Sequence, residues 1–350
     1  MPLSVIVGGQ YGSEGKGKTS LHIVRSDPST AAVIRVGGSN SGHTGIGRDG
    51  RSYALRQLPA GAIDGRVKVI FPAGAYIDVD LLLSEIDKLN YARDRIAINP
   101  LAHVITADHK AWEAKVHLRD SIGSTQSGTG AAVLSRVARG AGCLPAAVCA
   151  EDLPALAPYI TDTTALARGL LMQGRRIVIE GTQGFGLSVL HAEAWPKATS
   201  RDTTAAGFIA EAGLSPLDVD DITLVIRCHP IRVAGRQSGP LPHETSWAEI
   251  ADAAGIDRDL TELTTVTRAR RRVGQFDANI VRQAIAANRP TRIVLNHLDY
   301  VAPNSTGRVL DPIGRAFVDK IGDQIGQCVD WVGTSPADLT AYDDLLAVGT

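Results

Sequence analysis

A glycine- and lysine-rich segment near the N-terminus carries residue types that bind phosphate. Residues 8–19 read GGQYGSEGKGKT; they follow an apolar run and precede a helical pattern that we expect from Ser20 onward. Glycines allow consecutive backbone N–H groups to surround phosphate oxygens, and a lysine neutralises their charge. The segment therefore predicts a nucleotide site, with a glycine turn that merely joins a strand to a helix as the alternative.

The spacing within this segment limits which nucleotide it suits. Residues 12–19 satisfy the general pattern G-x-x-x-x-G-K-[ST], but the flanking residues 9–12 do not fit an ordinary P-loop. A dinucleotide fingerprint is also a poor fit, because two lysines in one turn suit a triphosphate better than a shared pyrophosphate. We therefore expect a triphosphate site in a loop of unusual type.

A second segment of small residues, GGSNSGHT at 37–44, places His43 among flexible neighbours. A histidine at such a loop tip, with a pKa near neutrality, can donate a proton to a reacting oxygen or stabilise the charge that develops on it. The alternative is a loop histidine that bonds only to its own backbone. Together the two segments predict chemistry at a phosphate.

Apolar runs and amphipathic stretches alternate along the chain and must position these loops. Apolar, β-branched runs predict buried strands, and apolar residues at three- and four-residue spacing predict helices. The predicted strands are 3–7, 31–36, 67–71, 95–98, 176–179, 222–226, 292–295 and 329–332, and the predicted helices include 79–89, 108–119, 163–172 and 277–287. This alternation predicts an α/β fold with a mostly parallel, helix-covered sheet. No linker or repeat divides the sequence, so we expect residues 1–350 to form a single domain.

The overall charge and the cysteines exclude several classes of protein. Lys and Arg total 36 against 37 Asp and Glu in 350 residues, a net charge of -1, so no general positive field attracts nucleic acid or an acidic membrane. The four cysteines lie far apart without a C-x-x-C pair, which favours reduced thiols over a zinc or disulfide framework. No basic leader and no apolar stretch of about 18 residues occurs, so we expect a cytoplasmic enzyme.

The two loop sequences, GGQYGSEGKGK and GGSNSGHT, resemble those of the adenylosuccinate synthetases, which join L-aspartate to C6 of IMP using GTP and Mg²⁺. Further motifs of that family recur in order along nearly the whole chain: IGST at 122–125, VAR at 137–139, EGTQG at 180–184, TTA at 203–205, RV at 232–233, RRRVG at 270–274 and NHLD at 296–299. The resemblance implies a P-loop-related α/β fold with a mostly parallel central sheet, covering helices and long active-site loops.

The resemblance also implies a two-step reaction. O6 of the purine attacks the γ-phosphate of the donor nucleotide, and the amine of aspartate then displaces phosphate from the 6-phosphoryl intermediate. By position, His43 stabilises the phosphoryl transfer, Lys16 lies at the γ-phosphate and Gln183 faces the O6 edge of the base. The Gly42 carbonyl binds Mg²⁺, and Ser13 is a weaker candidate ligand.

The remaining implied contacts fall into a donor group and an acceptor group. Donor contacts are expected from Gly12, Glu14, Gly15, Lys16, Gly17, Lys18, Thr44, Asn296, His297, Asp299, Ser335 and Pro336. Contacts to the purine monophosphate or to aspartate are expected from Ser13, Asn40, Ser124, Thr125, Gln183, Thr199, Val233, Thr265, Val266, Thr267 and Arg271. Arg139 matches an arginine that reaches the active site of the other subunit, so a homodimer is expected.

Ser13 departs from the family pattern at the catalytic centre. The family loop reads G-D-E-G-K-G-K, and its aspartate takes the N1 proton of the base and binds Mg²⁺. A serine hydroxyl is a weak base at neutral pH and a weaker Mg²⁺ ligand than a carboxylate. The chain is therefore either a degenerate enzyme or one adapted to another base. The group that replaces the missing base stays open among a substrate phosphate, a Mg²⁺-bound hydroxide and His43.

A smaller, uncharged residue at this position suits guanine. Serine leaves space beside N1 and can accept a hydrogen bond from the 2-amino group that distinguishes guanine from hypoxanthine. The expected acceptor is therefore a guanine nucleotide in place of IMP.

Ala269 is the second departure, because it replaces an arginine that contacts aspartate and the ribose 2′-hydroxyl in the family. Losing this charge-assisted bond removes about 1.5–3 kcal/mol from the binding of a ribonucleotide, whereas a deoxyribose loses nothing. The alternative is that Arg268 takes over the role. Both departures favour dGMP, as in a phage-encoded branch of the family that carries serine here and makes 2-amino-2′-deoxyadenylosuccinate from dGMP and aspartate for diaminopurine DNA.

The segment expected to contact the donor base lacks the lysine of the family. Asp299 can still accept from N1–H and the 2-amino group of a guanine, but His297 has no aliphatic stem to cover the base. Ser335 and Pro336 resemble the loop that closes over that base. The donor is therefore open among ATP, dATP and GTP.

Other functions remain as rival hypotheses. An adenylosuccinate synthetase would act on IMP with GTP despite Ser13. A nucleotide-binding regulator would bind a triphosphate without releasing phosphate, but His43, Lys16 and Gln183 all persist. Nucleic-acid binding is disfavoured by the near-zero net charge, since 270–272 is the only notable basic run in the sequence.

Overall fold

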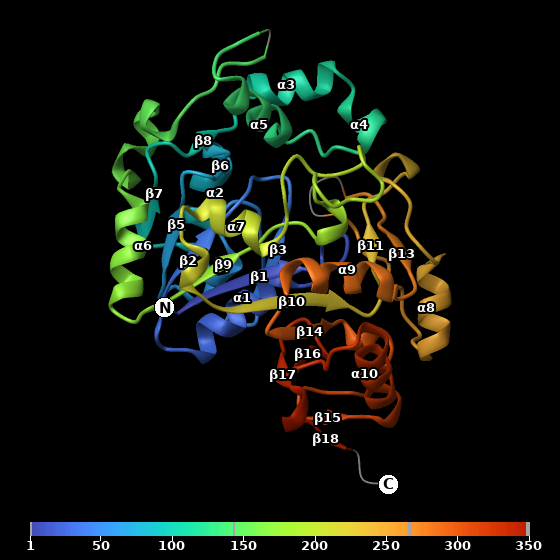
Figure 1. Cartoon of the computed structure of the whole chain (residues 1–350). Helices are drawn as coiled ribbons and strands as arrows, with labels where there is room; N and C mark the ends of the chain where they lie inside the picture. The colour runs from blue at the N-terminus through green and yellow to red at the C-terminus, as the bar shows by residue number, and fades with distance from the viewer. Residues whose placement is uncertain (1, 143, 265–267, 348–350) are drawn as a thin grey trace.

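The computed structural model describes residues 2–142, 144–264 and 268–347, and its centre is a nine-stranded sheet (Figure 1). The strand order is β17-β16-β14-β10-β1-β9-β2-β5-β7, and neighbours pair in parallel except β16 with β17. The strands are β1 (Leu3–Gly8), β2 (Thr30–Arg35), β5 (Lys68–Phe71), β7 (Ile96–Ile98), β9 (Arg176–Glu180), β10 (Val219–Arg227), β14 (Arg292–Asn296), β16 (Trp331–Val332) and β17 (Thr340–Ala341). The predicted α/β fold with a mostly parallel sheet is confirmed.

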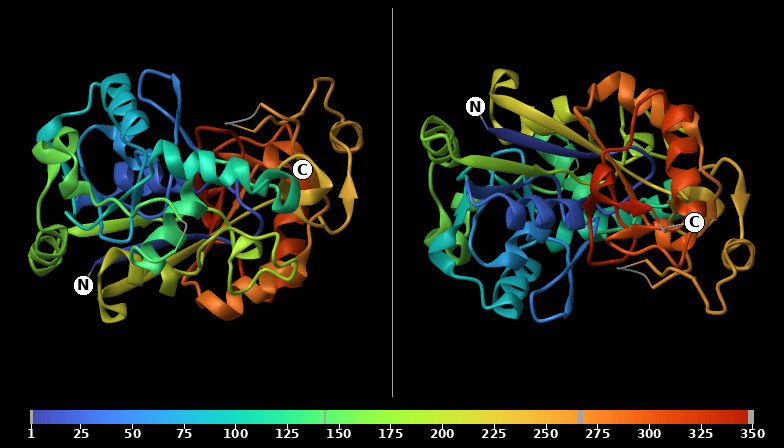
Figure 2. Two further views of the ribbon diagram at one scale, coloured as in Figure 1. Left: turned by 90° about the horizontal axis from the view of Figure 1, so that it is seen from above. Right: turned by 90° about the horizontal axis from the view of Figure 1, so that it is seen from below.

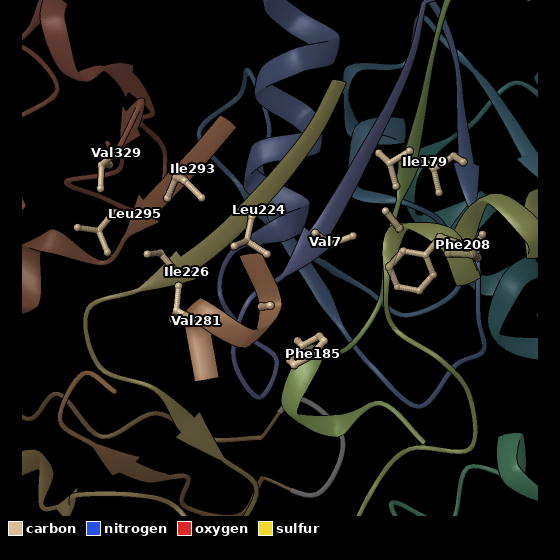
Figure 3. Packing of buried hydrophobic residues seen from close by; sticks show 14 of the residues in the cluster. Val7, Ile179, Phe185, Phe208, Leu224, Ile226, Val281, Ile293, Leu295 and Val329 are labelled. Carbon is tan, nitrogen blue, oxygen red and sulfur yellow. The ribbon is translucent and has the colours of Figure 1, made fainter. Parts of the chain in front are cut away.

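Alternate residues of the central strands pack on opposite faces of this sheet. Val5 and Val7 of β1 belong to one large apolar cluster, whereas Ile6 belongs to another. Figure 3 shows the first cluster, where Leu224 and Ile226 of β10 lie near Val281. Burial on both faces explains why the strands read as nearly continuous apolar runs.

The described residues form ten α-helices. They are α1 (Lys16–Ser26), α2 (Val79–Leu89), α3 (Ala107–Lys115), α4 (Leu118–Ile122), α5 (Thr129–Ala138), α6 (Thr163–Met172), α7 (Ala205–Ala212), α8 (Trp247–Ala254), α9 (Ala278–Asn288) and α10 (Pro312–Ile325). Residues of α6, α7, α9 and α10 pack in the first cluster, and α1 contributes to the cluster on the other face. The predicted helices 79–89 and 163–172 are confirmed at their bounds, and 277–287 is confirmed within one residue.

Four predicted boundaries were wrong. The predicted strand 222–226 extends over Val219–Arg227, because its first residues also pair with β1. The N-terminal helix begins at Lys16 and not at Ser20, because Gly15, at φ 99°, supplies the left-handed residue that precedes it. The predicted helix 108–119 is divided into α3 and α4, with His117 between them at φ 54°. The predicted strand 329–332 pairs only over Trp331–Val332.

Smaller sheets extend from the core. β11 (Ile231–Arg232), β13 (Arg272–Gly274) and β12 (Glu244–Thr245) form an antiparallel sheet, and β3 (His43–Ile46) with β4 (Ser52–Leu55) forms a hairpin. The remaining pairs are β6 (Tyr76–Ile77) with β8 (His103–Val104), and β15 (Val309–Leu310) with β18 (Leu346–Ala347). Viewed from above, the segment of α3 and α4 lies across the molecule, and the antiparallel sheet and α8 lie at one side (Figure 2).

Within the described part of the chain, none of the helices has both the length and the apolarity needed to cross a membrane.

Candidate active site

The loops that follow β1, β2, β9, β14 and β16 contribute to the lining of one cavity of about 670 Å³, and β11 with the loop after it adds a further wall. Ligands of open α/β sheets bind at this edge, where the carboxyl ends of parallel strands meet. The predicted site residues that line the cavity are Gly12, Ser13, Gly15, Lys16, Gly17, Lys18, Asn40, Gly42, His43, Thr44, Ser124, Thr125, Gln183, Thr199, Val233, Arg271, His297, Asp299, Ser335 and Pro336. Residues from distant parts of the sequence are thus brought to one place.

Some predicted site residues do not line this cavity. Glu14 and Asn296 are fully buried, and Asn296 Nδ2 donates to the carbonyl of Glu14 at 2.9 Å, so both support the loop from behind. Arg139 is exposed at the end of α5, and its service to a partner subunit stays a prediction. Thr265, Val266 and Thr267 lie outside the described residues.

The glycine-rich loop is organised by the carboxylate of Glu14. It accepts from the backbone N–H of Gly12 at 2.7 Å and of Gln10 at 3.2 Å, and it pairs with Lys16 Nζ at 2.6 Å. Lys16 is 4% exposed and lies in the first turn of α1. The loop therefore holds its lysine against an internal anion at the floor of the cavity.

Lys18 joins this loop to the one predicted to cover the donor base. Its Nζ donates to the carbonyl of Ser335 at 2.9 Å. Burial lowers the pKa of Lys18 to about 8, although Asp338 and Asp299 oppose that shift. Lys18 thus connects the two halves of the expected donor site.

Ser13 occupies an exposed, left-handed position in the cavity, with φ 60°. The guanidinium of Arg271 donates to the Ser13 hydroxyl, and Arg227 Nη1 donates to the Ser13 carbonyl at 3.1 Å. Two arginines, one on β10 and one preceding β13, therefore hold the residue that departs from the family.

His43 differs from the sequence expectation of a loop-tip histidine with a near-neutral pKa. It begins β3 and is 6% exposed, and its Nδ1 lies 2.5 Å from Glu180 Oε1. Arg35 Nη1 lies 3.0 Å from Nδ1 and 3.1 Å from Nε2. Burial and the Arg35 charge lower the pKa of His43 to about 4, so the ring is neutral at pH 7.

Glu180 is the buried anion that orients His43. Its carboxylate also accepts from the backbone N–H of Ala60 at 2.9 Å and of Gly61 at 3.2 Å. Burial alone would raise the pKa of Glu180, but its contact with His43, which donates a hydrogen bond to it, and the charge of Arg35 bring that pKa below its ordinary value. Sequence reasoning quoted the EGTQG motif without giving Glu180 a role, and it missed Arg35.

The loops expected to bind the acceptor monophosphate lie on another wall of the cavity. Glu113 of α3 accepts from the backbone N–H of Gly128 at 3.0 Å and of Ala131 at 3.1 Å, so it fixes the turn that follows Ser124. The hydroxyl of Thr199 is buried without a hydrogen-bond partner among the described residues. A buried hydroxyl without a partner favours a ligand that accepts its hydrogen bond, as a phosphate oxygen would.

Glu262 is a further cavity-lining residue that the sequence did not single out. It pairs with Arg227 at 2.5 Å, and Tyr300 donates to it at 3.2 Å. Burial would raise the pKa of Glu262, but the Arg227 charge outweighs it and the pKa falls to about 2. No spacing in the sequence connects these residues, because Arg227 ends β10, Glu262 follows α8 and Tyr300 follows β14.

The cavity offers few protein ligands for a metal ion. Among the described residues, no group of three or more His, Cys, Asp or Glu side chains is arranged to hold a metal ion. Mg²⁺ commonly takes one or two protein oxygens and completes its shell with phosphate oxygens and water. The Gly42 carbonyl, which lines the cavity, is compatible with a metal that arrives with a nucleotide.

Comparison with known proteins agrees with this geometry. Residues 5–144 and 145–310 match the family model described as adenylosuccinate synthetase. The adenylosuccinate synthetase of Thermococcus onnurineus is 34% identical over 343 residues, which cover 96% of each chain. That of Methanocaldococcus jannaschii is 34% identical over 340 residues, covering 95% of this chain and 94% of the relative.

Solved structures show the same architecture. Cyanophage S-2L succinoaminodeoxyadenylate synthetase, bound to dGMP and to dATP as an energy donor, has a TM-score of 0.80 at 30% identity, with 97% of this chain and 95% of that chain covered. Fully ligated adenylosuccinate synthetase from Plasmodium falciparum has a TM-score of 0.82 at 18% identity, with 97% and 100% covered, and supports the fold alone. The chain therefore belongs to the adenylosuccinate synthetase family, as a purine nucleotide:L-aspartate ligase driven by a nucleoside triphosphate.

Proposed function

We propose that this ligase joins L-aspartate to C6 of dGMP. A nucleoside triphosphate phosphorylates O6 of the base, and the amine of aspartate then displaces phosphate. The products are 2-amino-2′-deoxy-N6-succinyladenylate, a nucleoside diphosphate and phosphate, and the first of these is a precursor of diaminopurine DNA.

The observation that carries the proposal is the state of Ser13 in the cavity. A hydroxyl oxygen has two lone pairs and one hydrogen, and the Arg271 guanidinium uses one of the lone pairs. One lone pair therefore remains for the 2-amino group of guanine, which a carboxylate at this position would crowd. The phage synthetase of similar structure is described as binding dGMP, which supports the same acceptor.

Ala269 supports the choice of a deoxyribose. It lines the cavity, and its backbone N–H donates to Thr264 Oγ1 at 3.0 Å. A methyl side chain offers no hydrogen bond to a sugar hydroxyl, so a 2′-deoxyribose loses no hydrogen bond here relative to a ribose.

The chain's own residues supply charge and orientation for the phosphoryl transfer. Lys16 stabilises the oxygens of the transferred phosphoryl group once it leaves Glu14. The negative charge of that group and Glu180 at Nδ1 favour a proton on the His43 ring, whereas Arg35, 3.1 Å from Nε2, opposes it. Gln183 faces the O6 edge of the acceptor.

The Gly42 carbonyl is the proposed protein ligand of Mg²⁺, which when bound would neutralise charge on the donor phosphates. Ser13, the other expected ligand, does not fit this role, because Arg271 and the 2-amino group of guanine take both lone pairs of its hydroxyl and the Arg271 cation opposes a second positive charge there.

The proposed donor is ATP, dATP or GTP, held by the glycine-rich loop and by the segment around His297 and Asp299. The dATP described for the phage synthetase supports an adenine donor. A homodimer in which Arg139 reaches the partner's cavity is also proposed, and the exposure of Arg139, Leu134 and Val137 on α5 supports it.

A second candidate is an adenylosuccinate synthetase that acts on IMP with GTP. It is favoured by archaeal relatives of that name at 34% identity over nearly the whole chain. Ser13 counts against it, since the reaction on IMP then lacks the aspartate that takes the N1 proton.

The test is turnover of purified protein with L-aspartate and Mg²⁺ on either acceptor. ATP, dATP and GTP are offered in turn with dGMP or with IMP, and release of phosphate and the succinylated product is measured. We expect product from dGMP. Turnover of IMP without turnover of dGMP would replace the proposal with the second candidate, and absence of phosphate release in all mixtures would indicate a binding protein.

A further inference from the structure

The carboxylate of Glu262 lies between two arginines at the edge of the cavity. Arg227 approaches it with Nη2 at 2.5 Å from Oε1 and Nη1 at 3.4 Å from Oε2, and Arg271 Nη1 lies 4.0 Å from Oε2. Tyr300 donates to Oε1 at 3.2 Å. The Arg227 side chain is 0% exposed and that of Arg271 is 15% exposed, so a nearby carboxylate interacts strongly with both.

The same two arginines reach Ser13. Arg227 Nη1 donates to the Ser13 carbonyl at 3.1 Å, and the guanidinium of Arg271 donates to the Ser13 hydroxyl. Ser13 has φ 60°, a conformation that costs a residue with a side chain roughly 1 kcal/mol or more unless its surroundings hold it. Both contacts therefore determine where the hydroxyl lies.

Backbone bonds reinforce the link between Glu262 and Arg271. The Arg271 N–H donates to the Glu262 carbonyl at 2.9 Å, and Arg271 Nε donates to the Leu263 carbonyl at 3.2 Å. The charge at residue 262 and the direction of the Arg271 side chain are thus coupled through a short segment.

We propose that Glu262 is a positioning residue for the acceptor: it holds Arg227 and Arg271 so that Arg271 fixes the Ser13 hydroxyl against the purine. The assignment of N1–C2 as the purine edge that faces Ser13 rests on the proposed function. Glu262 itself bonds to no substrate and acts through Ser13.

Glu262→Gln tests the proposal, because it preserves the shape and removes the charge. We expect kcat/KM for the acceptor to fall about 10- to 100-fold, the loss of one charge-assisted bond, while the Kd of the Mg²⁺-bound donor stays within about twofold. Glu244→Gln is the matched control: Glu244 pairs with Arg272 at 2.7 and 2.5 Å outside the cavity lining, and its variant should leave acceptor kinetics unchanged.

A double-mutant cycle with Ser13→Ala separates positioning from a structural role. If Glu262 acts through the Ser13 hydroxyl, Glu262→Gln costs much less in the Ser13→Ala background than in the wild type. An equal factor in both backgrounds overturns the proposal, as does an unchanged kcat/KM in Glu262→Gln itself. Glu262→Asp, which retains the charge, should recover part of the loss.

Tyr300→Phe provides a milder perturbation if Glu262→Gln does not fold. It removes one hydrogen bond to the Glu262 carboxylate. We therefore expect a smaller loss of kcat/KM for the acceptor, and we expect that loss to be smaller still in the Ser13→Ala background. An unchanged kcat/KM contradicts the proposal. Each cycle uses dGMP or IMP, according to which of them the wild type turns over. The same cycle can also be measured as binding, from calorimetric Kd values for dGMP and for IMP, if no turnover is seen. Use of IMP alone would overturn the proposed function and leave the test of Glu262 valid.

Discussion

Replacing Glu180 by glutamine should destabilise the protein severely. The Glu180 carboxylate is 0% exposed and accepts from His43 Nδ1 at 2.5 Å, from Ala60 N–H at 2.9 Å and from Gly61 N–H at 3.2 Å. It also lies 3.8 Å from Arg35. The glutamine in Glu180→Gln has nearly the same shape but replaces one accepting oxygen with an NH2 group, which only donates.

The expected size of the effect follows from these contacts. At least one of the donors facing the new amide loses its acceptor, and Arg35, which is 1% exposed, loses its buried counter-charge. Breaking a buried ion pair on one side costs about 3–5 kcal/mol. That is a large share of the free energy of unfolding of a native protein, which is roughly 5–15 kcal/mol.

Urea-induced unfolding followed by circular dichroism measures this loss. Glu244→Gln serves as the control, because its carboxylate is 43% exposed and its removal should cost less than about 1 kcal/mol. If Glu180→Gln loses no more than the control, the carboxylate is not the anion on which this buried cluster depends. A folded variant should also lose kcat, since His43 no longer has a carboxylate to stabilise its protonated form.

Other predictions address specificity and pH. Ser13→Asp should shift preference from dGMP towards IMP, because a carboxylate beside Arg271 crowds the 2-amino group; an unchanged ratio of kcat/KM values would refute the steric account. Ala269→Arg should improve use of GMP relative to dGMP by about tenfold, as a new bond to the 2′-hydroxyl would, and a fixed ratio would place ribose discrimination elsewhere. His229, which is 7% exposed, has its pKa lowered by burial and by Arg227 from 6.5 to about 4, so its stabilising effect is complete above pH 6.5 and is lost as the pH falls towards 4. His229→Gln should therefore remove about 3 kcal/mol of pH-dependent stability from unfolding curves over that interval, and a loss below about 1 kcal/mol would show that His229 is not the group responsible.

The central strands and several helices were predictable because their signals are local. Apolar runs such as 3–7 and 222–226 reflect burial on both faces of the sheet, and helix 79–89 shows its periodicity and its Asp78 cap within a dozen residues. That the loops at 8–19 and 37–44 line one cavity was predictable from their residue types and from the family resemblance.

The carboxylates that organise the site could not be found in this way. Glu180 meets His43 across 137 positions of sequence, and Glu262 meets Arg227 across 35, so no spacing links the partners. The burial of His43 also depends on tertiary packing, which converts a residue expected to titrate near neutrality into one that is neutral at pH 7. The predicted helix boundaries were wrong at Gly15 and His117, where a residue with positive φ changes the direction of the chain.

The pairing of Lys16 with Glu14 has a consequence for the resting enzyme. The lysine is almost wholly enclosed, yet it needs no counter-ion from solution, because the loop carries its own. If Lys16 binds the donor phosphates as proposed, an incoming triphosphate would compete with this tethered carboxylate, and binding would exchange one anion for another at the same ammonium group. An anion of lower charge density would compete less well with that carboxylate, so the loop would select the donor by charge before its base makes contact.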